Sequence, residues 1–194
     1  MPLIGVLALQ GDVREHVAAL ERCGATTRLV RRPSELDGIH GIVLPGGEST
    51  TMSKLAVAFE MFEPLRERLQ TGLPALGTCA GMIMLADRIL DPRSGQQTFG
   101  GIDITVRRNA FGRQIDSFES ELDFAGDAAP LHAVFIRAPW VEDAGESVAV
   151  LARVSSGPTA GRIVAVQQEQ LMATSFHPEV THDDRIHRAF LNLV

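Results

Sequence analysis

The sequence predicts an α/β domain of three layers, in which helices flank a central sheet that is mostly parallel and partly mixed. Up to about residue 90, apolar strand-like runs alternate with helical runs, which is typical of a parallel sheet covered on both faces. Beyond that point, short runs rich in Val and Ile are separated by turn residues, which indicates a change to mixed pairing. The 194 residues, 45% of them hydrophobic, suit one domain over 1–194.

Four strands are expected in the first half, and each is a short apolar run that ends in a turn. They cover residues 3–9, 26–30, 41–44 and 73–78. Asp12 is a plausible cap for the first helix, which Gly24 ends. Ser49 or Thr50 opens a second helix after a Pro-Gly-Gly turn, and a third helix begins near Ala80.

The second half begins with a loop over residues 89–101, whose role cannot be read from its residues. Five further runs read as short strands, at residues 102–106, 132–139, 147–154, 162–168 and 171–178. A helix over about 183–193 closes the chain, and neither an internal repeat nor an interdomain linker is evident.

Composition excludes several classes of function. Lys and Arg number 18 against 24 Asp and Glu, for a net charge of −6, so neither nucleic acid nor an anionic membrane is an expected partner. The two cysteines form no disulfide framework, and the apolar start lacks a basic leader and a cleavage site. A cytoplasmic location with reduced thiols is therefore expected.

Cys79 stands out because it lies between Gly77 and Gly81, where an expected strand turns directly into an expected helix. This is the pattern of a nucleophile elbow, with cysteine in place of serine. A side chain at either glycine would crowd the tight turn, and the start of a helix favours the thiolate. A free cysteine is more often a small buried core residue than a nucleophile, and Cys23 is interpreted as such a core residue.

A thiol nucleophile needs a base and a group that orients the base. His177 and Glu179 lie two residues apart at the end of a strand, and Pro178 between them is expected to hold the segment extended. Both side chains would then face one cleft, with Glu179 bound to one nitrogen of His177 and Cys79 facing the other.

A metal site is the competing interpretation, because His182, Asp183 and His187 follow closely in the sequence. Their spacing does not place two histidines on one face of a helix. No metal is therefore expected, and His182 and His187 are interpreted as cap and surface residues.

The stretch from Pro45 to Thr50 also lies between a strand and a helix. The backbone N–H of Gly47 could stabilise an oxyanion, together with the N–H of Ala80 after the nucleophile. An ordinary glycine turn with a Ser or Thr cap is the alternative for this stretch.

These motifs together resemble the glutaminase subunits of pyridoxal 5′-phosphate synthase. They are GVLALQGDVREH, LPGGEST, GTCAGMIMLA, RNAFGRQIDSFE, VFIRAP and SFHPEVT, in this order from Gly5 to about Phe190. The cysteine elbow and the His-Pro-Glu stretch are shared with class I (triad) glutamine amidotransferases, which have a flavodoxin-like sheet. The LQGDVREH, GGEST and RNAFGRQ stretches are specific to the pyridoxal phosphate branch.

The resemblance implies hydrolysis of L-glutamine to glutamate and ammonia by Cys79, His177 and Glu179, without a cofactor. It also implies an oxyanion hole made by Gly47 and Ala80. The residues that it places against glutamine are Gly47, Glu48, Ser49, Arg108, Ile136 and Arg137. Without the resemblance, the two arginines would be taken for surface residues at strand ends.

The resemblance further implies a partner, a (β/α)8-barrel synthase subunit that forms a ring-shaped core and receives the ammonia. Gln10 is expected near the site, where it could sense this partner. Three alternatives stay open: a glutaminase that serves another synthase, a cysteine peptidase, and a non-catalytic cap of the synthase. The branch-specific stretches argue against the first, and the intact Cys79, His177 and Glu179 argue against the last.

Overall fold

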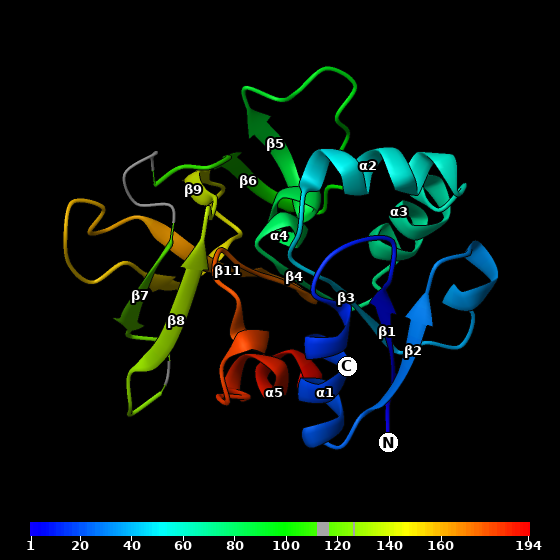
Figure 1. Cartoon of the computed structure of the whole chain (residues 1–194), viewed down its shortest axis with the longest axis horizontal. Coiled ribbons are helices and arrows are strands. Elements are labelled where there is room, and N and C mark those ends of the chain that lie inside the picture. Colours follow the sequence, from blue (N-terminus) through cyan, green and yellow to red (C-terminus); the bar gives the residue numbers. More distant parts are fainter. Residues whose placement is uncertain (112–116, 126) are drawn as a thin grey trace.

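The computed structural model describes residues 1–111, 117–125 and 127–194 (Figure 1). Strand β1 (Leu3–Leu7) is followed by α1 (Val13–Arg22), β2 (Thr26–Val30) and the 3₁₀ helix η1 (Pro33–Leu36). Next come β3 (Gly41–Leu44), α2 (Ser49–Ala58), α3 (Phe62–Gln70), β4 (Ala75–Thr78) and α4 (Ala80–Leu85).

The remaining elements are mostly strands. In chain order they are β5 (Ala86–Leu90), β6 (Ile102–Arg107), β7 (Ser117–Leu122), β8 (Leu131–Ile136), β9 (Trp140–Ala144), β10 (Ala149–Arg153), β11 (Ile163–Gln168) and β12 (Leu171–Thr174). The 3₁₀ helix η2 (Pro178–Val180) and helix α5 (Arg185–Leu191) follow.

The described strands form a large sheet in the order β2-β1-β3-β4-β12-β11-β9-β6-β5, with β10 added beside β11. The five strands from β2 to β12 are parallel, and β11 and β9 then pair antiparallel. The fold class is thus confirmed as α/β with a mostly parallel, mixed sheet. Strands β7 and β8 form a separate hairpin beside it (Figure 1).

Helices cover both faces of the parallel half (Figure 1). Alternate residues of β3 point to opposite faces: Ile42 packs in the apolar cluster of α2, α3 and α4, whereas Val43 packs in that of α1 and α5. Within the described residues, no helix has the length and apolar character needed to cross a bilayer.

Several expectations about elements are corrected. Strand β1 ends at Leu7 rather than at residue 9, and α3, β5, β7 and β9 were not expected. Asp12 precedes α1 without capping it through its side chain, because its carboxylate lies 3.4 Å from His177 instead. Helix α2 begins at Ser49, but Glu48 provides the cap by accepting hydrogen bonds from the N–H groups of Thr50 and Thr51.

Candidate active site

Cys79 occupies the turn between β4 and α4. Its backbone angles, φ 50° and ψ −102°, are rarely adopted by residues other than glycine, as is typical of a strained functional turn. A Cβ at Gly77 would lie 2.5 Å from the carbonyl oxygen of Gly81, and one at Gly81 would lie 2.0 Å from that of Leu44. Both positions therefore require glycine, and the predicted elbow geometry is confirmed.

Neighbouring strands hold the cysteine on two sides. Its backbone N–H donates to the Thr174 carbonyl at the end of β12, at 2.8 Å. Its thiol lies 3.9 Å from the Ile136 carbonyl at the end of β8. Cys79 is 7% exposed, and it lines the cavity described below.

His177 follows β12 after Ser175 and Phe176, and its backbone N–H donates to the Val134 carbonyl. Its side-chain Nδ1 lies 2.7 Å from Oε1 of Glu179, and both residues are buried. The expected extended segment is wrong, because Pro178–Val180 forms a 3₁₀ turn that proline readily begins. This turn places the Glu179 carboxylate behind the imidazole ring rather than in the cavity.

Opposing effects set the protonation of this pair. Burial alone would lower the pKa of His177, but interactions with Asp12, the Cys79 thiol and Glu179 outweigh it and raise that pKa. Burial raises the pKa of Glu179, and the hydrogen bond to His177 opposes the increase. The two groups are 2.7 Å apart, so they share a proton and titrate as a unit.

The loop from Gly46 to Glu48 packs against both His177 and the loop that precedes α1. A Cβ at Gly46 would lie 2.4 Å from Cε1 of His177, so only glycine leaves room for the ring. The Gly46 carbonyl accepts from the N–H of Asp12 at 3.3 Å, and the Glu48 N–H donates to Oε1 of Gln10 at 2.8 Å. The loop is therefore fixed by the Gln10–Asp12 segment on one side and by α2 on the other.

Charged side chains converge beyond this loop. Arg108 donates to Oε1 of Glu48 at 3.0 Å and to Oε1 of Gln96 at 2.7 Å, and Gln96 in turn donates to Oγ of Ser49. Burial would raise the pKa of Glu48, but the N–H groups and hydroxyl groups of Thr50 and Thr51 lower it to about 2. Glu48 is consequently an anion at any physiological pH.

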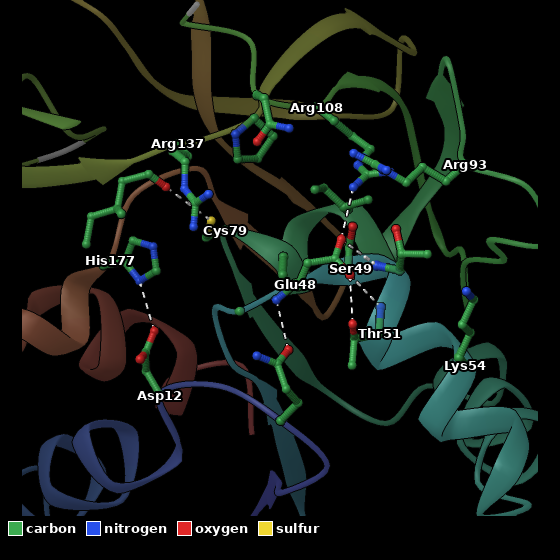
Figure 2. Close-up of a pocket in the computed structure, with 18 residues that line it drawn as sticks. Asp12, Glu48, Ser49, Thr51, Lys54, Cys79, Arg93, Arg108, Arg137 and His177 are labelled. Carbon is green, nitrogen blue, oxygen red and sulfur yellow. Dashed lines mark hydrogen bonds and ion pairs between the residues drawn. The ribbon is translucent and has the colours of Figure 1, made fainter. Parts of the chain in front are cut away.

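One cavity of about 740 Å³ joins these groups (Figure 2). His177 and Asp12 lie at one end, and Arg93, Arg108 and Lys54 lie at the opposite end. The expected site residues on its wall are Gly47, Glu48, Ser49, Cys79, Ala80, Arg108, Ile136, Arg137 and His177. The volume is in the range of small-molecule sites, and the two ends differ in the ligand groups they would hold.

A cation site is also conceivable here, because ligand atoms of Asp12, His177 and Glu179 all lie within 4.8 Å of one another. The shared atom would be Nδ1 of His177, which Glu179 already contacts at 2.7 Å. A proton on this nitrogen satisfies the same two carboxylates, so the geometry does not require a metal.

Comparison with known families decides the relationship. The model of the SNO glutamine amidotransferase family matches residues 6–194. The chain belongs to this family. A pyridoxal 5′-phosphate synthase subunit PdxT from Nocardioides sp. is 66% identical over 100% of the chain and 96% of its own length. The PdxT subunit from Nocardia farcinica is 64% identical over 100% of the chain and 86% of its own length.

Solved structures agree with this membership in the SNO family. A crystal structure of a glutamine amidotransferase superposes with a TM-score of 0.90 at 46% identity, covering 98% of the chain and 97% of that protein. A putative GMP synthase subunit from Thermoplasma acidophilum has a TM-score of 0.69 at 20% identity, which supports the fold alone.

Several residues of this SNO family site were not foreseen. Asp12 was interpreted as a helix cap, and Gln96 lies in the loop that could not be read. His187 was expected on the surface but is fully buried, whereas His182 is exposed as expected. In the motif RNAFGRQIDSFE, which starts at Arg108, residues 112–116 lie outside the described residues.

Proposed function

We propose that this chain hydrolyses L-glutamine to L-glutamate and ammonia and delivers the ammonia to a pyridoxal 5′-phosphate synthase. One observation carries the proposal. A strained cysteine and a carboxylate-bound histidine line one end of a cavity whose other end holds arginines. Glutamine has a side-chain amide at one end and charged α-groups at the other, which matches this polarity.

The α-groups of glutamine would lie at the arginine end. The Arg108 guanidinium forms a planar fork that suits the α-carboxylate, and the ionised Glu48 suits the α-ammonium. Glu48 and Arg108 already contact each other at 3.0 Å, so each would exchange part of that contact for the substrate. Ser49, Ile136 and Arg137 would line the path toward the sulfur.

Acylation would begin when the Cys79 sulfur attacks the amide carbon and His177 holds the thiol proton. The carbonyl oxygen becomes an oxyanion, which the N–H groups of Gly47 and Ala80 would stabilise. His177 then donates its proton to the amide nitrogen. The C–N bond breaks, and ammonia leaves behind a thioester on Cys79.

Deacylation would use the same groups in reverse. His177 accepts a proton from water, and the resulting hydroxide attacks the thioester carbon. The second oxyanion collapses, the C–S bond breaks, and the proton returns to the thiolate as glutamate leaves. Glu179 stabilises the imidazolium that forms in each half of the reaction.

The partner follows from the family resemblance. We propose a (β/α)8-barrel synthase subunit in a ring-shaped hetero-oligomer, which would use the ammonia with a pentose phosphate and a triose phosphate. The whole chain, 1–194, would act as one glutaminase domain in that assembly.

The test compares two nitrogen sources with the purified chain and the synthase subunit. With glutamine, cofactor formation should require this chain and stop in Cys79→Ala. With an ammonium salt, the synthase should proceed without the chain. Cofactor formation from glutamine in the absence of the chain would contradict the proposed function.

A further inference from the structure

Two histidines outside the proposed triad lie directly behind Glu179. His16 of α1 and His187 of α5 are both 0% exposed. Nδ1 of His16 is 3.0 Å from Nε2 of His187, and Nε2 of His16 is 3.0 Å from Oγ1 of Thr78. The same Nε2 is 3.4 Å from Oε2 of Glu179. A continuous series of side-chain contacts, called the row below, therefore runs from His187 through His16 to the carboxylate that contacts His177.

Both histidines are neutral in this row. Burial lowers the pKa of His16 well below its ordinary value, and the neighbouring His187 lowers it further. Burial also lowers the pKa of His187, to about 4, although Asp184 opposes the change. Each ring consequently carries one N–H, and the question is which nitrogen holds it.

The contacts of the row select one arrangement. If His16 donated from Nδ1 to His187, the proton of His187 would be on its Nδ1, which has no partner among the described residues. The lone pair on Nε2 of His16 would also face the Glu179 carboxylate. A buried N–H without a partner and two opposed acceptors are both unfavourable.

In the opposite arrangement, His187 donates from Nε2 to Nδ1 of His16, and His16 donates from Nε2 toward Thr78 and Glu179. Among the described residues, the one ring nitrogen left without a partner is then an acceptor, Nδ1 of His187. This arrangement also turns the N–H of His16 Nε2 toward Oε2 of Glu179 at 3.4 Å. The contact is electrostatic rather than a hydrogen bond, and it is the favourable contact of an oxygen that has no hydrogen-bond donor in the part of the chain that the structure describes. It leaves no ring N–H of the two histidines without an acceptor.

We propose that His16, fixed in its Nε2–H tautomer by His187, is a positioning residue that holds the Glu179 carboxylate in place for His177. With the N–H of His16 facing Oε2 at 3.4 Å, Oε1 stays on Nδ1 of His177 at 2.7 Å, which leaves the other nitrogen of His177 for Cys79. The effect of His16 on kcat rests on the proposed glutaminase function. The assignment of the two histidine tautomers does not.

The tautomers are measured on the wild-type protein by ¹⁵N NMR of the histidine rings at neutral pH. Both His16 and His187 should show a protonated Nε2 and an unprotonated Nδ1. A protonated Nδ1 on His16 would overturn the proposal whether or not the chain hydrolyses glutamine.

The kinetic test uses a matched pair of variants, assayed with the synthase subunit present. The amide nitrogen of His16→Gln reaches the former position of Nε2, whereas that of His16→Asn reaches only the former position of Nδ1. We expect His16→Asn to have a kcat about 10- to 100-fold below that of the wild type, with KM changed by no more than about twofold. His16→Gln should retain most of the wild-type kcat. His182→Gln, on the surface, is the control.

The pH profile separates positioning from a general loss of structure. The groups that face Glu179 are His177, Asp12 and His16, with Cys79 next to His177 and with Asp184 and Arg22 acting on His187. Without the His16 donor, the acidic limb of kcat should move to higher pH in His16→Asn but not in His16→Gln. Equal kcat and equal limbs in these two variants would overturn the proposal, whereas an inactive wild type would instead refute the glutaminase function.

Discussion

The two sides of the His177 ring differ in how much of their surroundings reach water. On the cavity side, the Asp12 and Glu48 side chains are 44% and 49% exposed. On the rear side, Glu179 and His16 have side chains with 0% exposure, and His187 is equally buried. Exposed charged groups on loops thus line the cavity, while a buried carboxylate backed by two neutral histidines fixes the base. The base therefore has a rigid rear face and a cavity face that the Asp12 and Gly46 loops contact directly.

The largest effect should come from the cavity side, by removing its nucleophile. Cys79→Ala is expected to lower glutamate release at least about 10⁴-fold, because no other group can form the thioester. Circular dichroism should show an intact fold. Cys23→Ala is the control, since the Cys23 thiol lies outside the cavity, near the backbone carbonyl of Asp184. Similar losses in the two variants would exclude Cys79 as the nucleophile.

The next effect concerns activation through the exposed loops. The peptide between Gly46 and Gly47 is oriented by the Asp12 N–H, and the following peptide by Gln10. Gly47 has a φ of 151°, so this backbone can rotate without a side-chain clash. If the Gly47 N–H points away from the cavity in the isolated chain, one donor to the oxyanion is missing. We therefore expect the isolated chain to be a weak glutaminase that the synthase subunit activates about 10²–10³-fold, which is the rate typically lost with one such donor.

The measurement of this activation is steady-state glutamate release at equal glutaminase concentration, with and without the synthase. Gln10→Leu should reduce the activation, because it removes the acceptor of the Glu48 N–H. Equal rates with and without the synthase would refute the activation and leave the glutaminase assignment standing.

On the rear side, Glu179→Gln should lower kcat about 10²-fold, because the amide retains the shape but loses the charge that stabilises the imidazolium. His177→Ala should lose more, since it removes the acid and base itself. Full activity in Glu179→Gln would show that the 2.7 Å contact with His177 is structural only.

A smaller effect is expected from Gln96 at the arginine end. Gln96→Leu removes contacts with Ser49 and Arg108 but touches no reacting atom. We expect KM for glutamine to rise about fivefold, equivalent to about 1 kcal/mol, with little change in kcat. The control is Gln97→Leu, at an exposed neighbour that contacts Ser53 through its backbone. A fall in kcat without a change in KM would contradict a role in binding.

The rear histidines should also make stability depend on pH. Their folded pKa values lie below the unfolded value of 6.5, so the unfolded chain binds more protons as the pH falls below about 6.5. The stability they provide is complete above that pH and is lost as the pH falls toward 4. For His187 alone, we expect a loss of about 2 kcal/mol between about pH 7 and pH 5.

Urea unfolding at each pH measures this loss. His187→Gln should flatten the dependence relative to the wild type, whereas His182→Gln should leave it unchanged. A wild-type slope identical to that of His187→Gln would show that His187 is not buried in its neutral form.

The two sides of His177 also differ in how well the sequence predicts them. The cavity side is encoded in short motifs at strand ends, where topology alone brings side chains together. The elbow at Cys79 was therefore predictable. The contact between His177 and Glu179 was predicted for the wrong reason, because the 3₁₀ turn at Pro178 depends on packing that spacing does not reveal.

The residues on the rear side of His177 could not be predicted from sequence motifs. His16 and His187 meet across 171 residues, and only the packing of α1 against α5 brings them together. The missed strands β5, β7 and β9 have half-polar sequences without a long apolar run. Their pairing partners, rather than their own residues, make them strands.

The fit between Gly11 and Gly46 has a mechanical consequence. A Cβ at Gly11 would lie only 1.7 Å from the Gly46 carbonyl oxygen, so the two loops touch with no slack between them. A displacement of the loop before α1 must therefore also move the Gly46 carbonyl, which accepts the N–H of Asp12. The close packing of two glycines thus couples the position of an exposed loop to the backbone that borders the cavity of Cys79.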